Sequence, residues 1–299
     1  MSTFAALGAL ETGLIYALVA LGVYLSFRVL DFPDLTVDGS FPLGAAVTAA
    51  LITSGVDPWI SMLAAMIAGA AAGAVTAFLN VRLGILHLLA SILTMIALYS
   101  INLRVMGAPN VALFSEATAL TPLEALPLPA FQSKPLAFLV AIAVIAIVLN
   151  WFLRTETGLA MRAIGANPRM ARAQGARVGL LIGMGMALSN ALVALGGSLF
   201  AQSQGFADVT LGVGTIVVGL AAVIVGEAIL PPKRIWIALL ACIIGSIIYR
   251  FAIQLALSAD WLGLEAQDLN LATAILIVLA MSAPSVRAKL GARRRGPAR

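Results

Sequence analysis

The residues best suited to chemistry in this chain lie in one short stretch that is rich in carboxylates. The segment from Arg28 to Ser40 reads RVLDFPDLTVDGS and places three aspartates beside a proline and a glycine. Two uses fit such a stretch. Thr36, Asp38 and Ser40 can line the route of a polar solute at the start of a half-helix. Alternatively, Asp38 or Ser40 caps the helix that follows, in a loop on the inner face.

Four further polar side chains are candidates for the same route. Asp208 and Thr210 precede a pair of glycines, so they have the same two interpretations, route lining or helix capping. Asn190 lies in an apolar run, where it either lines the route or forms a hydrogen bond between helices. Arg250 also lies in an apolar run. It can meet a substrate carboxylate, extend toward the lipid headgroups or pair with an acid such as Asp208.

Catalytic and metal chemistry are not expected. The chain has one histidine and one cysteine, which leaves no multi-histidine site, metal cluster or disulfide framework. It also lacks the GxxxxGK[ST] pattern that binds ATP phosphates, because none of Lys134, Lys233 and Lys289 follows such a loop. We therefore expect no catalytic residue, no metal and no cofactor in this chain. If ATP drives transport, ATP and magnesium bind to another subunit.

The elements that must position these side chains are membrane helices. Hydrophobic residues make up 62% of the 299 residues and charged residues only 10%, whereas soluble domains carry about 25% charged residues. The apolar runs reach the ~20 residues that a helix needs to cross a bilayer. We expect an all-α polytopic membrane protein with about nine transmembrane helices and no nucleic-acid partner. The expected spans are 4–28, 40–54, 59–80, 86–104, 135–153, 179–203, 212–230, 235–257 and 269–284.

The basic residues indicate how the chain is oriented. With the N-terminus outside, all but three of the 18 basic residues fall in inner segments or in the tail, as the positive-inside rule requires. The exceptions are Arg104, Lys134 and Arg250. We therefore expect the N-terminus outside and the C-terminus inside, with the basic tail touching anionic lipid headgroups.

An internal repeat relates the two halves of the chain. The sequence ALVALG occurs at 17–22 and at 191–196, and half of the positions from 17 to 36 match those 174 residues later, including a polar F-x-D-x-T pattern. Because the copies cross the membrane in opposite directions, we expect an inverted-topology repeat with the route at its interface. The expected divisions are a first membrane half (1–134), a linker span with a cytoplasmic loop (135–178), a second membrane half (179–284) and a basic tail (285–299).

Two features of the apolar runs predict local structure. The span 40–54 is too short for a ~30 Å crossing, so the extended stretch before it must supply the missing length. Gly69 and Gly73 lie four residues apart, with Ala65 and Ala77 on the same helix face. Small residues at this spacing predict close packing against another helix.

The longest inner loop reads RTETGLAMRAIGANPRMARAQGARVG at 154–179 and predicts two short helices separated by Asn167-Pro168. A short, stiff helix that projects from the membrane is what a soluble motor subunit can grip. The alternative is a basic loop that only satisfies the positive-inside rule.

This loop is similar to the cytoplasmic coupling loop of ABC importer permeases of the branched-chain amino acid type, through the motif G-x-A-M-R-A-I-G-x-N-P-x-x-A-x-x-x-G. The segments PDLTVDGSF and TMIALYSINLRVMGAPN (94–110) resemble a narrower branch, the permeases of tryptophan/tyrosine ABC uptake systems. The resemblance covers nearly the whole chain. It implies that the loop docks on an ATPase through Gly158, Arg162, Ala163, Gly165, Asn167, Pro168, Arg172 and Gly175.

The resemblance also implies a type II-like permease of an ATP-driven importer in the bacterial inner membrane. The implied partners are a second permease subunit in a homodimer, two cytoplasmic ATPases, a periplasmic or lipid-anchored solute-binding protein and membrane lipids. The implied solute is an amino acid or a similar small organic molecule. The main rival is a stand-alone secondary transporter, which needs buried ion ligands at mid-membrane, whereas Asp34, Asp38 and Asp208 lie at span edges. A second rival, a scaffold or lipid-modifying enzyme, would have no solute uptake.

Overall fold

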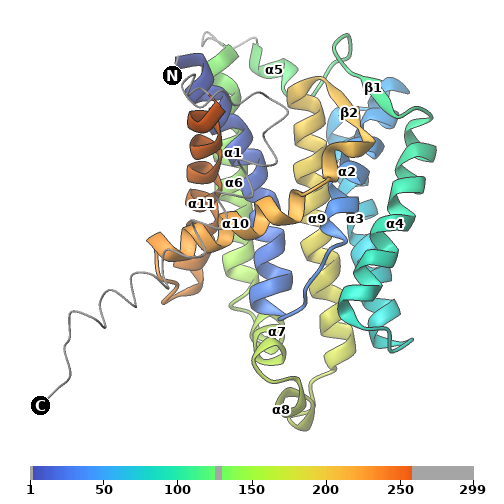
Figure 1. Cartoon of the computed structure of the whole chain (residues 1–299), viewed down its shortest axis with the longest axis vertical. Coiled ribbons are helices and arrows are strands. Elements are labelled where there is room, and N and C mark those ends of the chain that lie inside the picture. The colour runs from blue at the N-terminus through green and yellow to red at the C-terminus, as the bar shows by residue number, and fades with distance from the viewer. Residues whose placement is uncertain (1–2, 125–129, 258–299) are drawn as a thin grey trace, which may run out of the picture.

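The computed structural model describes residues 3–124 and 130–257 (Figure 1). The expected span 269–284 and the expected tail 285–299 lie outside the described residues. The elements are α1 (Thr3–Val23), the π-helix η1 (Tyr24–Val29), α2 (Val37–Thr53), α3 (Pro58–Val81), α4 (His87–Met106), β1 (Asn110–Ala112), α5 (Thr121–Glu124), α6 (Ala130–Phe152), α7 (Glu156–Ala166), α8 (Pro168–Ala173), α9 (Val178–Gln204), β2 (Phe206–Asp208), the 3₁₀ helix η2 (Val209–Gly212), α10 (Thr215–Ile229) and α11 (Ile235–Leu257).

The helices confirm the expected class of polytopic membrane protein. Among the described residues, seven helical segments are long and apolar enough to span a membrane, and α2 is a shorter apolar helix. Each expected span up to residue 257 coincides with one of these segments, although α6 begins earlier than expected, at Ala130. The outer loop contains one addition that the sequence did not predict. Its strand β1 pairs antiparallel with β2, which follows α9.

The ends of the bundle differ in structure. Figure 1 shows the N-terminus, α5 and the small sheet at one end, and α7 and α8 at the opposite end. Most of the long helices run between these ends, whereas α10 is strongly inclined in this view. The short helices α7 and α8 therefore form an arm that projects beyond the bundle.

The second membrane crossing is a broken one, as the short span 40–54 predicted. Helix α1 continues into η1, which ends where the Leu30 amide donates to the Leu25 carbonyl. The backbone then turns at Asp31, which has a φ of 53°, and extends through Pro33. Helix α2 begins at Val37, partway up the bundle (Figure 1). The extended stretch thus supplies the length that α2 lacks.

Small residues set the closest helix contacts. A Cβ atom at Gly69 would lie 2.4 Å from the carbonyl oxygen of Asn190, and one at Gly73 would lie 2.2 Å from that of Met186. Real Cβ atoms do not approach so closely, so α3 can rest on α9 only because these positions are glycine. The predicted small-residue face of α3 is therefore confirmed as a packing surface.

Contacts between the two halves repeat at equivalent positions. A Cβ at Gly22 would lie 2.7 Å from the Ser189 carbonyl oxygen. In the repeat, Gly22 corresponds to Gly196, 174 residues later, and Ser189 corresponds to Ile15, 174 residues earlier. These two are also in contact, because a Cβ at Gly196 would lie 3.5 Å from the Ile15 carbonyl oxygen. The elements α1, α2 and α3 thus correspond to α9, α10 and α11, and they run in opposite directions along the bundle. This arrangement is the inverted repeat that the sequence predicted.

Candidate functional site

A network of buried hydrogen bonds links the broken segment to α9 and α3. The Asn190 amide nitrogen donates to Asp34 Oδ2 at 2.7 Å, and Ser40 Oγ donates to Asn190 Oδ1 at 2.7 Å. Thr36 Oγ1 lies 2.7 Å from Thr76 Oγ1. All five side chains are fully buried. Buried polar groups are costly unless paired, so this network fixes how the extended stretch sits between α3 and α9.

Asp38 joins the starts of two helices. It lies in the first turn of α2, and its carboxylate accepts hydrogen bonds from the first amides of α10, from Ile216 at 2.7 Å and from Gly214 at 3.3 Å. Both helices present the positive ends of their dipoles at this carboxylate. The sequence expected Asp38 to line the route or to cap its own helix. The structure shows that it bonds the start of α10, and its place on the route stays a prediction.

The F-x-D-x-T pattern has the same local structure in both copies. Asp34 Oδ1 accepts from the Thr36 amide at 2.9 Å, and Asp208 Oδ1 accepts from the Thr210 amide at 2.7 Å. Each is a turn in which an aspartate side chain binds the backbone two residues on. The first copy lies in the buried network, whereas the second lies at the end of the bundle that carries the sheet.

The second copy is stabilised as an anion. Partial burial disfavours the charged form of Asp208. Hydrogen bonds from the hydroxyl and amide of Thr210 and from the Asn110 side chain outweigh that effect and lower the pKa of this carboxyl. Asn110 belongs to β1, so the charge of Asp208 helps to hold the outer loop against β2.

Two arginines have partners of different kinds within the described residues. The guanidinium of Arg250 lies over the ring of Tyr16, 3.9 Å from its centroid, which is a cation–π contact between α11 and α1. Arg28 forms an ion pair with Glu227, which joins η1 to the far end of α10. The ring contact of Arg250 differs from all three partners that the sequence suggested for it, although a substrate contact stays a prediction.

The projecting arm is fitted to the bundle by two glycines. A Cβ at Gly165 would lie 2.1 Å from the Val29 carbonyl oxygen, and one at Gly158 would lie 2.4 Å from that of Phe152. Helix α7 therefore packs directly on the end of η1. The side chain of Asn167 accepts from the amides of Arg169 and Met170, so it caps α8, which begins at Pro168. The two predicted short helices and their boundary are confirmed.

The other residues expected to dock on an ATPase lie on the free surface of the arm. Their side chains are exposed and include Arg162, Ala163, Asn167, Pro168 and Arg172, with Gly175 at the turn after α8. The arm also exposes Met170, whose side chain is 63% accessible. The predicted set thus divides into two glycines that face the bundle and a surface that faces away from it.

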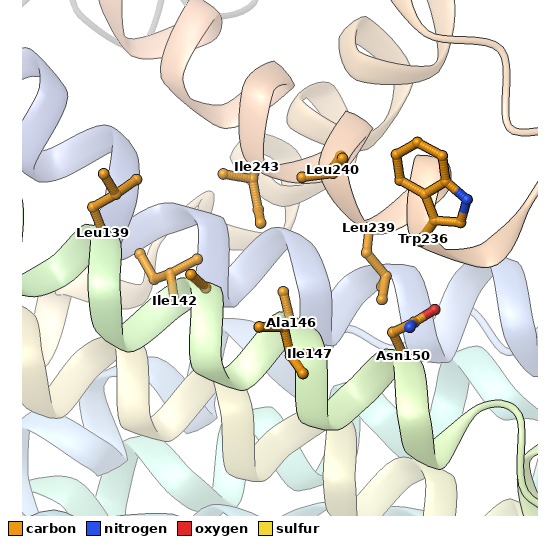
Figure 2. A pocket seen from close by; sticks show the side chains of 10 residues that line it. Leu139, Ile142, Ala146, Ile147, Asn150, Trp236, Leu239, Leu240 and Ile243 are labelled. Atoms are coloured by element: carbon orange, nitrogen blue, oxygen red, sulfur yellow. The ribbon is translucent and has the colours of Figure 1, made fainter.

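Two cavities in the bundle have different chemistry. The first lies between α6 and α11, with a volume of 370 Å³ (Figure 2). Its labelled side chains are aliphatic, apart from Trp236 and Asn150, so it offers few groups to orient a polar solute. The second, of 390 Å³, lies between α2, α4 and η2, and Asp38 and Asn102 are in its wall. Only Asp38 among the predicted route residues lines either of these two cavities.

Sequence reasoning missed several residues of this region. Asn102 donates to the Gly39 carbonyl at 3.2 Å, and Thr76 completes the buried network. Nearer the sheet, Thr48 donates to Ser198 at 2.6 Å. Each is a polar side chain inside an apolar helix, and that rarity was the available signal. The partners could not be identified, because they depend on which helices cross and where.

Comparisons with known proteins agree with this fold. A family model described as the permease component of a branched-chain amino acid transport system matches residues 5–281. The tyrosine transport system permease protein of Clostridioides difficile (strain R20291) is 38% identical over 266 residues, which are 89% of this chain and 86% of that protein. A Rickettsia prowazekii (strain Madrid E) protein, Uncharacterized protein RP368, is 34% identical over 282 residues, 92% of this chain and 95% of that protein.

A solved structure, PsaBC from Streptococcus pneumoniae in complex with Fab, covers 94% of this chain and 91% of its own, with a TM-score of 0.52 and 16% identity. At this identity the likeness concerns the fold alone. No observation favours the stand-alone secondary transporter. The chain belongs to the branched-chain amino acid transport system permease family, and it is the permease component of an ABC-type transport system.

Proposed function

We propose that this permease imports an aromatic amino acid, driven by ATP hydrolysis on a separate subunit. Two observations support an amino acid as the solute. The family is described by branched-chain amino acid transport, and a relative with 38% identity is named a tyrosine transport permease. In this proposal a periplasmic or lipid-anchored binding protein delivers the solute, so that the permease need not select it alone.

The proposed assembly contains two copies of this chain and two cytoplasmic ATPases in the bacterial inner membrane. The N-terminus lies outside and the arm of α7 and α8 inside. Supporting this orientation, the N-terminus and the arm are at opposite ends of the bundle (Figure 1), and the arm carries the arginines that the positive-inside rule assigns to the cytoplasm.

The close packing of α7 on η1 is the observation that carries the coupling proposal. With Gly165 pressed against the Val29 carbonyl, a displacement of the arm must move the end of η1. The chain continues from η1 through the extended stretch to Asp38, whose carboxylate holds the start of α10. Closure of the ATPases would thus shift α2 and α10, the two half-helices of the repeat, against each other.

The remaining predicted route residues take a supporting part in this proposal. Thr36, Ser40 and Asn190 belong to the buried network, which keeps the extended stretch in register with α3 and α9. Asp208 and Thr210 sit where the outer loop meets the second half-helix, on the side from which the binding protein would release its solute. We propose that the solute passes Asp38 on its way from the region of Asp208 and Thr210 toward the buried network.

The coupling proposal is tested on the exposed surface of the arm. Ala163→Glu places a charge at an exposed position of the arm, so the permease should fold normally. Copurification of the ATPase from membranes should fall by roughly tenfold or more, since a charge facing a packed interface costs several kcal/mol. The matched control is Ala117→Glu, which changes another exposed alanine, in the outer loop. Unchanged copurification in the Ala163 variant would reject the docking role.

The solute class is tested on the binding protein that this proposal assigns to the permease. Its melting temperature should rise on addition of tyrosine, tryptophan or phenylalanine, because a ligand that binds the folded state stabilises it. A branched-chain amino acid serves as the comparison. Stabilisation by a sugar or an inorganic ion, with none by any amino acid, would contradict the proposed solute class.

A further inference from the structure

The cavity between α2, α4 and η2 has two acceptors in its wall, Asp38 and the Asn102 amide oxygen, that can take further hydrogen bonds from a donor. Its polar wall consists of Asp38 and Asn102, together with the hydroxyl-bearing residues Tyr99 and Ser100. Asn102 is fully buried, yet its Oδ1 atom has no hydrogen-bond partner among the described residues. A buried acceptor of this kind is costly to leave unpaired.

The orientation of the Asn102 amide follows from its other partner. Its nitrogen donates to the Gly39 carbonyl oxygen at 3.2 Å, and a carbonyl oxygen cannot itself donate. The nitrogen must therefore face Gly39, which leaves the oxygen as the unpaired atom. A rotated amide would not remove the acceptor, since it would bring two oxygens together.

Asp38 adds further acceptor capacity in the same wall. Each of its oxygens receives one amide hydrogen bond from the start of α10, from Ile216 and Gly214. A carboxylate accepts about four hydrogen bonds, so capacity remains on both oxygens. These bonds also occupy amides of the α10 N-terminus that would otherwise attract an anion. The wall contains no lysine or arginine. A carboxylate-bearing end of a solute therefore meets no cationic side chain here and only the hydroxyls of Tyr99 and Ser100 as side-chain donors.

The rest of the cavity is apolar. Pro42, Met95, Ile96 and Val213 line it, beside the ring of Tyr99. A volume of 390 Å³ lies at the lower end of the range for small-molecule sites. The cavity opens at the surface of the chain, where Ile96, Tyr99 and Val213 are exposed. Lipid chains are poorly suited to it, because they would cover a carboxylate and an unpaired amide oxygen without satisfying either.

We propose that this cavity is a station on the solute route that receives the amino group of an amine-bearing solute. The ammonium group binds Asn102 Oδ1 and the free capacity of Asp38, and the side chain of the solute lies against Tyr99 and its apolar neighbours. This station rests on the proposed import of an aromatic amino acid. In this inference the amino group is the part of the solute that the permease itself recognises. That recognition takes place where the half-helices α2 and α10 meet.

A protection experiment tests the station in the assembled transporter without ATP. Cys242 is buried, so Ile96→Cys supplies an accessible thiol at the cavity mouth. Tyramine and tyrosine should slow maleimide labelling of this cysteine, whereas tyrosine without its amino group should not. Adding Asn102→Leu should raise the concentration for half protection by roughly tenfold, the usual effect of losing a hydrogen bond to a charged group. Adding Ser100→Ala is the milder second variant if Asn102→Leu fails to fold.

The outcomes separate this inference from the proposed function. Equal protection by the deaminated analogue, or none by either amine, overturns the amino-group station. Labelling requires no solute selection by a binding protein and no hydrolysis, so it does not depend on the coupling. Failure of the proposed function would instead appear as wild-type vesicles that take up no amino acid with ATP. Wild-type uptake that persists unchanged in Asn102→Leu would also overturn the station alone.

Discussion

At the scale of single residues, Asn190 is the side chain on which the buried polar network depends. It donates to Asp34 and accepts from Ser40, and neither partner is exposed. Sequence reasoning singled out Asn190 as a polar group in an apolar run, and Ser40 as part of the carboxylate-rich stretch before a short helix. It left open whether Asn190 lines the route or bonds another helix, and whether Ser40 lines the route or caps its helix. That the two meet could not be predicted, since their positions are 150 residues apart. Only the crossing of α2 and α9 decides that they meet.

Replacing Asn190 should therefore be severely destabilising. Asn190→Leu leaves Asp34 without its side-chain donor and Ser40 without its acceptor, which together cost roughly 2–5 kcal/mol. The melting temperature of the purified permease should fall accordingly. The neighbouring Ser189→Ala is the control, because it removes only one bond, to the Gly22 carbonyl, worth about 1 kcal/mol. Equal shifts for the two variants would show that Asn190 is not the centre of the network.

At the scale of elements, the broken second crossing could be predicted, but the contacts of its helix α2 could not. The length of span 40–54 alone required an extended stretch before it. That Asp38 would bond the amides of α10 could not be predicted, because a helix start gives the same signal whether its aspartate caps its own helix or another. The strand β1 was likewise missed, since three residues pair only because β2 lies beside them.

The packing of α7 on η1 gives a prediction at this scale. Gly165→Leu forces a side chain into the Val29 carbonyl, so α7 must lift off η1, with a cost of about 1–3 kcal/mol or more. The melting temperature should fall, and ATP hydrolysis in the assembled transporter should no longer be stimulated by the loaded binding protein. Gly183→Leu is the matched control, because no atom lies within 4 Å of a Cβ at that position. A normal stimulation in Gly165→Leu would contradict coupling through η1.

At the scale of the whole molecule, the inverted repeat was readable from sequence because its polar pattern is unusual for an apolar protein. The matching contacts of Gly22 with Ser189 and of Gly196 with Ile15 extend that relation from residues to packing. The expected direction of each span followed from the arginines, which needed no knowledge of packing. The steep inclination of α10 could not be predicted from the sequence, because the tilt of a helix depends on its packing against neighbouring helices.

Sidedness labelling checks the orientation of the molecule. With Cys242 buried, Arg169→Cys on the arm and Ala117→Cys in the outer loop each provide an exposed thiol. In sealed right-side-out vesicles, an impermeant maleimide should label position 117 and spare position 169. Inside-out vesicles should give the reverse pattern. Labelling of position 169 from the exterior would overturn the orientation and the coupling proposal with it.

The bond from Asp38 to α10 also has a consequence for biogenesis. The amide partner at Gly214 is translated 176 residues after the carboxylate. At ~5–20 residues per second, roughly 10–35 s elapse before it emerges from the ribosome. Throughout that interval the nascent first half contains the Asp38 carboxylate, but the α10 amides that bind it have not yet been made. Its maturation must therefore wait for the second half, and a ribosome stalled before Gly214 would leave an immature insertion intermediate for membrane quality control.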